Sequence, residues 1–182
     1  MEINITHRVT PIPAARAESC WAAAALVLHN GARPRAAQVT APMVTPDTGA
    51  VATAPHPAHV GAGTLAQFAL EWGLERLTTN DWTAPGLARI LAPRPLWAGA
   101  YLPNGHAMVL TGLFGDGSPG GTHVTIFDPL PAGAGSMYKL PFSVWATRYP
   151  LRTMQLLFRP PLTRERPAAS HRSIDAFLGG EE

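Results

Sequence analysis

The sequence has little cysteine, little lysine and no long apolar run. Its 182 residues include one cysteine, which excludes an intrachain disulfide and any cysteine-rich zinc site. Arginine supplies nearly all of the 14 basic residues, and these are scattered along the chain. The longest uninterrupted apolar run, residues 21–28, is far shorter than the roughly 20 residues that cross a bilayer. We therefore expect neither a nucleic acid nor a membrane as partner.

The beginning of the sequence, "MEINITHRVTPIP", lacks the basic and then apolar layout of a signal peptide. We therefore expect synthesis and folding in the cytoplasm, and a protein delivered into a target cell by a dedicated machine would look the same. The length and the 46% hydrophobic content indicate one globular domain, residues 1–160. Residues 161–182 mix Pro, Arg and Ser and form an appendage. We expect the protein to be a monomer.

Three segments have the apolar spacing of helices. The first covers residues 20–30, with Ser19 as N-cap and Gly31 at its end. The second begins after Thr64, which we expect to be its cap, and ends near Gly73. The third is "APGLARILAP", closed by a proline, and residues 32–63 between the first two have no clear period.

The second half of the chain consists of short β-rich runs separated by Gly, Asn and Pro turn signals. These runs are "PLWAGAYL", "HAMVLTGLF", "THVTIFDP" and "TMQLLFR", with "SMYKL" as a further candidate strand and "PFSVWATRY" as a short helix. Helices followed by antiparallel strands predict an α+β fold.

Cys20 stands at the start of the first predicted helix. A single cysteine is most often a packed core residue. At this position, however, the helix dipole lowers the pKa of a thiol, and free backbone N–H groups can hold an oxyanion beside the sulfur. A nucleophile at Cys20 would also need a base within reach.

Among the seven histidines, His106 is the strongest candidate for that base. It follows the turn "PNG" and opens a buried strand, so rigid backbone would aim its imidazole. A satisfied polar residue at a strand end is the alternative reading of this position. His123 is more typical of a strand face, and the other histidines lie in termini, loops or a helix end: His7, His29, His56, His59 and His171.

Asp128 ends the next predicted strand, because Pro129 follows it. An Asp before Pro is by itself typical of a turn. If the two strands pair through the turn "GDGSPGG", however, His106 and Asp128 lie at the same end of the hairpin. There the carboxylate could fix the imidazole tautomer and stabilise its cation. We therefore interpret the three residues together as a nucleophile, a base and a residue that orients the base: Cys20, His106 and Asp128.

The segments "SCWAAAA", "LARILAPRPLW" and "GHAMVLTGLFGDGSPGGTHVTIFDPLPAGAGSMYKL" resemble the bacterial papain-like cysteine peptidases of the AvrRpt2 type. The resemblance covers most of residues 9–158. It implies a papain-like fold, in which a helical half that carries Cys20 packs on a β-rich half that carries His106 and Asp128. It also implies that these three residues are catalytic and that Gly105 contacts the substrate.

One position departs from the pattern of this family. The family usually has Gln six residues before the cysteine, where its amide completes the oxyanion hole together with the backbone of the cysteine. Here that position is Ala14. Loss of one such donor costs roughly 10²–10³ in rate. Arg16, Gln38 and Asn104 are candidate substitutes.

The resemblance implies a cysteine endopeptidase that cleaves a protein substrate and acts as a bacterial effector or toxin. A cognate immunity protein and a delivery machinery are the further partners that it suggests. The alternatives are deamidation or transglutamination by the same triad, and a weakened scaffold that binds a partner. We expect no cofactor and no metal, because His56, His59 and His106 lack a metal-binding spacing and a carboxylate.

Overall fold

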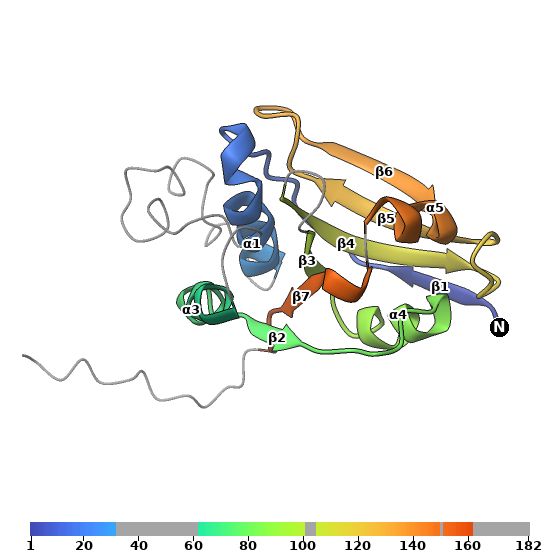
Figure 1. Ribbon diagram of the computed structural model, residues 1–182. Helices are drawn as coiled ribbons and strands as arrows, with labels where there is room; N and C mark the ends of the chain where they lie inside the picture. Colours follow the sequence, from blue (N-terminus) through green and yellow to red (C-terminus); the bar gives the residue numbers. More distant parts are fainter. Residues whose placement is uncertain (32–61, 101–104, 150, 162–182) are drawn as a thin grey trace, which may run out of the picture.

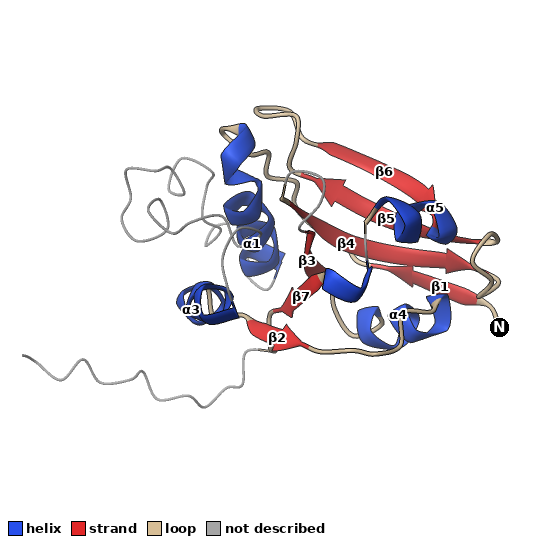
Figure 2. Ribbon diagram, viewed as in Figure 1, coloured by secondary structure: helices blue, strands red, loops and turns tan. Residues whose placement is uncertain are grey.

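A computed structural model of the protein describes residues 1–31, 62–100, 105–149 and 151–161. A seven-stranded sheet runs through these residues, with helices on both of its faces (Figures 1 and 2). In chain order the elements are β1 (Ile3–Thr6), η1 (Ala17–Ser19), α1 (Cys20–Gly31), α3 (Ala62–Glu71), β2 (Glu75–Leu77), α4 (Ala84–Leu91), β3 (Leu96–Ala100), β4 (His106–Gly115), β5 (Thr122–Asp128), β6 (Ser136–Pro141), α5 (Phe142–Arg148), η5 (Leu151–Thr153) and β7 (Gln155–Phe158).

All pairs of neighbouring strands in the sheet are antiparallel, in the order β2-β7-β3-β4-β5-β6. The long strand β4 lies in the middle. The first half of β4 pairs with β3, from Ala100↔His106 to Leu96↔Leu110, and its second half pairs with β1. The hairpin that the turn "GDGSPGG" predicts is present, as β4 and β5. Helices and an antiparallel sheet together confirm the predicted α+β class.

The sheet is buried on both faces, because alternate residues of its central strands enter two hydrophobic clusters. Met108 and Leu110 of β4 pack in the cluster that contains α4 and α5. Ala107 and Val109 pack in the cluster that contains α1 and α3. Helices therefore cover both faces of one sheet, with α1 and α3 on one face and α4 and α5 on the other.

A β-bulge at Thr111 keeps the core continuous along β4. Leu110 pairs with Ile126, but Gly112 pairs with Thr125, so Thr111 is an extra residue on β4. Because of this extra residue, Leu113 enters the same cluster as Leu110 despite its odd spacing from it.

Helix α3 begins at Ala62, before the Thr64 that was predicted to cap it. Its end agrees with the prediction. Gly73 has a φ of 61° and its N–H donates to the Leu70 carbonyl, while the Leu74 N–H donates to Ala69. This pair of bonds is a Schellman motif, which needs the left-handed conformation that glycine adopts without strain.

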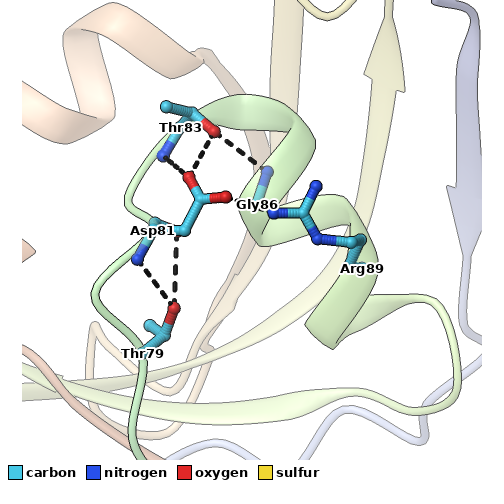
Figure 3. Close-up of polar contacts among 5 residues, drawn as sticks. All are labelled: Thr79, Asp81, Thr83, Gly86 and Arg89. Carbon is cyan, nitrogen blue, oxygen red and sulfur yellow. Dashed lines mark hydrogen bonds and ion pairs between the residues drawn. The ribbon is translucent and has the colours of Figure 1, made fainter.

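A polar network fixes the loop that leads into α4 (Figure 3). Thr83 is the N-cap, and its Oγ1 accepts from the Gly86 N–H at 3.1 Å. Asp81 accepts from both the N–H and the hydroxyl of Thr83, and Arg89 pairs with the same carboxylate from the next turns of the helix. The Thr79 hydroxyl in turn accepts a hydrogen bond from the Asp81 N–H at 3.1 Å.

Two short strands were not predicted. β1 has the sequence "INIT", in which apolar and polar residues alternate, with Ile3 buried and Asn4 exposed. This alternation is typical of a strand, but it covers only four residues. β2 has only three residues, two of them charged, so tertiary pairing with β7 determines its conformation. As a result, strands precede and interrupt the predicted series of helices.

Two further predictions fall largely outside the described residues. These are the irregular segment 32–63, of which the last two residues begin α3, and the appendage 161–182, of which only Pro161 is described. Within the described parts of the chain, no helix has the length and apolarity needed to cross a membrane.

Candidate active site

Cys20 is the first residue of α1 and is 1% exposed. The helix packs on the sheet through a run of buried alanines, and the aromatic residue after Cys20 anchors it. Trp97 of β3 donates from Nε1 to the Trp21 carbonyl at 3.0 Å, and Phe68 of α3 contacts the Trp21 ring edge-on. Sequence-distant aromatic residues therefore fix the first turn of the helix, and with it the thiol.

The backbone before Cys20 differs from the prediction that Ser19 caps the helix. Ser19 ends the 3-10 helix η1, which continues directly into α1. The hydroxyl of Ser19 accepts from the Arg16 N–H at 3.1 Å and donates to the Arg16 carbonyl at 2.9 Å. Helical structure therefore begins at Ala17, one turn earlier than predicted, with Arg16 as the N-cap and Ser19 as the third residue that bonds back to it in a capping box.

His106 is the first residue of β4, as predicted, and pairs with Ala100 of β3. Gly105 precedes it with a φ of 59°, a conformation that side chains with a Cβ rarely adopt. Helix α1 packs against β4, and Figure 1 shows the start of α1 near the beginning of β4. The side chain of His106 is 16% exposed, so most of its imidazole is removed from solvent.

Asp128 is the last residue of β5, and its carboxylate meets His106 as the hairpin predicts. Nε2 of His106 lies 2.9 Å from Oδ2 of Asp128. The Leu130 N–H donates to Oδ1 at 2.9 Å, and the Tyr138 hydroxyl donates to Oδ2 at 3.3 Å. With Nε2 facing the carboxylate, Nδ1 is the imidazole nitrogen left to interact with Cys20.

The electrostatics favour a charged imidazole. Burial of His106 opposes its protonation, but hydrogen bonds to Asp128 and to Cys20 outweigh burial and raise the pKa of His106 to about 9. Burial also opposes ionisation of Asp128, yet hydrogen bonds from His106 and the Leu130 N–H keep the pKa of this carboxyl below its ordinary value. At neutral pH the pair is therefore an imidazolium beside a carboxylate.

Ala14 is buried and lies between the entry to α1 and the loop that follows Asp128. Its N–H donates to the Pro129 carbonyl at 2.9 Å, and its carbonyl accepts from the Gly133 N–H at 2.8 Å. Position 14 is therefore held beside the site, but its methyl group offers no donor for an oxyanion. Of the candidate substitutes, Arg16 is exposed, and Gln38 and Asn104 lie outside the described residues.

The other histidines are elsewhere. His7 contacts the Leu91 carbonyl, His29 is in the last turn of α1, and His123 stacks on Phe114. His56, His59 and His171 are not among the described residues. In the described ranges, no group of three or more His, Cys, Asp and Glu residues could hold a metal ion.

Three supporting contacts were not predicted from the sequence: those of Tyr138 and the Leu130 N–H with Asp128, and that of Trp97 with α1. The segment "SMYKL" was a candidate strand, and pairing it with "THVTIFD" would have placed a tyrosine near Asp128. The register Tyr138↔Ile126, however, depends on a seven-residue loop that the sequence does not specify.

Together these groups can carry out acyl transfer. A thiol beside an imidazolium can react as the thiolate, the imidazolium can give its proton to a leaving amine, and the carboxylate holds the ring. A family model described as "Papain-like cysteine protease AvrRpt2" matches residues 3–144. No curated protein and no solved structure matches the chain.

Proposed function

The chain belongs to the family of the papain-like cysteine protease AvrRpt2 and is a cysteine peptidase, and on this premise we propose that Cys20, His106 and Asp128 are its catalytic residues. Cys20 is the nucleophile, His106 the acid and base, and Asp128 the residue that orients His106. The substrate is a protein, which the enzyme cleaves internally.

The reaction proceeds through an acyl-enzyme. The Cys20 thiolate attacks the carbonyl carbon of the scissile peptide bond, and the carbonyl oxygen becomes an oxyanion. His106 transfers its proton to the nitrogen of the leaving amine, the C–N bond breaks, and a thioester remains on Cys20. His106 then takes a proton from water, the resulting hydroxide attacks the thioester, and the thiol is regenerated as the new carboxyl end leaves.

The observation that carries this proposal is the 2.9 Å contact between His106 and Asp128, formed by strand ends that lie near the start of α1. A carboxylate in this position holds the ring so that Nδ1 faces the thiol, and it stabilises the imidazolium. The raised pKa of His106, to about 9, supports the same assignment.

The oxyanion would be bound by the backbone N–H of Cys20 at the helix start. The second donor of the family is missing, because Ala14 has no side-chain amide. We expect Gly105, next to His106, to contact the backbone of the substrate, since its lack of a side chain permits a close approach.

We further propose that the protein acts as a monomeric effector or toxin that a dedicated machinery delivers into a target cell. An immunity protein in the producing cell is the matching expectation. Expression of the wild-type protein and of Cys20→Ala in candidate target cells tests this role, because toxicity should require the thiol. Equal toxicity of the two proteins would contradict it.

The decisive experiment for the chemistry maps new protein N-termini in cells that express either the wild-type protein or Cys20→Ala. The wild type should generate a recurrent set of new N-termini that is absent with Cys20→Ala. Purified protein and a peptide that spans one such site should then reproduce the cut. Identical N-termini in both samples would contradict proteolysis by Cys20.

Ala14 favours one second candidate, a papain-like scaffold that binds a partner with little turnover. The rate of alkylation by iodoacetamide, measured at a pH below the ordinary thiol pKa, distinguishes this scaffold from an active peptidase. Because Cys20 is the only cysteine, every adduct reports on it. Rapid labelling at low pH supports an activated nucleophile, and labelling as slow as for a free thiol supports the scaffold.

A further inference from the structure

Tyr138 shares a hydrogen-bond acceptor with His106. It lies on β6 opposite Ile126, and its hydroxyl donates to Oδ2 of Asp128 at 3.3 Å. The same oxygen accepts from Nε2 of His106 at 2.9 Å, while the Leu130 N–H donates to Oδ1. The carboxylate thus has three donors from three different segments, and two of them meet at one oxygen.

We propose that Tyr138 is a positioning residue for the triad, which holds the Asp128 carboxylate against His106 and limits how strongly Asp128 attracts the imidazole proton. Donors on both oxygens fix the plane of the carboxylate, so Oδ2 stays directed at Nε2. Two donors on one oxygen also compete for its negative charge, so each bond is weaker than it would be alone. The inference rests on the proposed function, since it assumes that Asp128 orients His106.

The surroundings of Tyr138 keep its hydroxyl in the donor form. Burial, the neighbouring Tyr149 and the Asp128 charge all raise the pKa of Tyr138, and Arg148 at the end of α5 acts in the opposite direction to a smaller extent. Tyr138 therefore does not ionise in the working range of the enzyme. The groups that titrate near Asp128 are His106 and, through it, Cys20.

The test uses the rate of Cys20 alkylation by iodoacetamide as a function of pH, which needs no substrate. Cys20 reacts in two steps: one when the thiolate–imidazolium pair forms, and one when the imidazolium loses its proton at higher pH. Tyr138→Phe removes only the hydroxyl, so Asp128 should stabilise the imidazolium more strongly. We expect the second step to move to higher pH by roughly half a unit, and the first step to stay in place because the imidazolium is present before and after it.

Two controls separate this role from a structural one. Thr111→Val removes a hydroxyl that donates to the Thr125 carbonyl of β5 rather than to Asp128, and it should leave both steps in place. On an Asp128→Asn background, Tyr138→Phe should cause no additional shift, because the charge on which it acts is gone. On a mapped peptide, Tyr138→Phe should also lower kcat about 5-fold, the size of one net hydrogen bond.

A second step that stays unchanged in Tyr138→Phe, or that moves to lower pH, would overturn the inference. So would a shift of equal size in Thr111→Val, or a shift that persists on the Asp128→Asn background. Failure of the proposed function gives a different result: the second alkylation step moves as expected, but the wild type cleaves no protein.

Discussion

The two faces of the sheet are covered by helices whose side chains differ in size. On the face covered by α1 and α3, helix α1 contributes small side chains such as Ala24 and Ala25, both 0% exposed. Aromatic rings of Trp21, Phe68 and Trp97 belong to the same cluster. Under α4 and α5 the contacts are made mainly by larger residues, such as Leu87 and Trp145. Both faces share β4 and β5, so they differ in what packs on the sheet rather than in the sheet itself.

Because of this difference, we expect one face to determine mainly the turnover of the enzyme and the other mainly its free energy of unfolding. Alanines let α1 lie close to the strands, and a close contact leaves the thiol little freedom to shift relative to His106. Helix α4 is remote from the thiol and depends on the polar network at its N-terminus (Figure 3). Changes near the start of α1 should therefore alter turnover with little effect on unfolding, and changes at α4 should do the reverse.

The largest effect should come from Cys20→Ala. It removes the proposed nucleophile and should abolish cleavage of a mapped peptide. Because alanine is favourable in the first turn and nearly fills the buried site, the thermal unfolding midpoint should change little. Activity of the variant and its unfolding midpoint, measured on one preparation, check both halves of this expectation. Residual cleavage at the wild-type rate would show that another residue is the nucleophile.

His106→Ala should lower kcat by about 10³-fold or more, since it removes both the base and the imidazolium that stabilises the thiolate. It should also raise the pKa of Cys20, seen as alkylation that requires higher pH. Asp128→Ala should cost less, because Asp128 orients the ring and does not react. His123→Ala is the matched control, and loss of activity in this variant alone would overturn the assignment.

The same pair predicts a pH dependence. Because the pKa of His106 is about 9, against an ordinary value of 6.5, the imidazolium persists at neutral pH. Turnover should therefore decline as pH rises through about 9. The contribution of His106 to folding is complete below about 6.5 and is lost as pH rises through about 9, whereas the contribution of Asp128, whose pKa is lowered, is lost when the pH falls into the acid range. A pH profile of kcat/KM and of the unfolding midpoint checks both.

Ala14→Gln tests the oxyanion hole at the edge of the α1 face. An amide aimed at the developing oxyanion stabilises the transition state more than the ground state, so the gain should appear in kcat rather than KM. We expect a rise of at most ~10²–10³, reduced if the buried position does not admit the longer side chain. Kinetics on a mapped peptide measure it. An unchanged or lower kcat would indicate that another donor completes the hole.

Gly86→Ala tests the opposite face, and it should change turnover least. A Cβ at Gly86 would overlap the side chain and the carbonyl oxygen of Asp81, so the loop before α4 must move. We expect a loss of about 1–3 kcal/mol in the free energy of unfolding, with kcat unchanged at temperatures where the protein is folded. Denaturant unfolding measures it.

Arg89→Ala, which removes only an exposed ion pair, should destabilise less. A kcat that falls together with stability in Gly86→Ala would mean that the two faces are coupled.

The residues of the candidate site could be proposed from the sequence because each stands at an element boundary. Cys20 follows Pro-rich entry residues and begins an alanine run, and His106 and Asp128 flank a hairpin whose turn is clear. What supports the site could not be predicted in the same way. The contacts from Trp97 to Trp21 and from Tyr138 to Asp128 depend on how segments distant in the sequence pack, and no local pattern encodes them.

The errors in the elements have a similar cause. Ser19 and Thr64 are good capping residues, but they do not stand at the N-caps predicted for them, because helical backbone starts earlier in both places. Strand β2 is too short for its own sequence to determine its conformation. The bulge at Thr111 shifts the alternation of β4, and the isolated Gly112 in "HAMVLTGLF" is a weak local signal for it.

The order of the elements along the chain limits when the proposed site can assemble during synthesis. The N-terminal amine lies against the Asp116 carbonyl, 115 residues away, and the anchor of α1 joins residues 76 apart. Such contacts close large loops, so folding should be slow compared with that of helical proteins of similar size. A ribosome-bound chain that ends before β4 contains the thiol but neither its base nor its carboxylate. Peptidase activity can therefore arise only after most of the sheet has been translated.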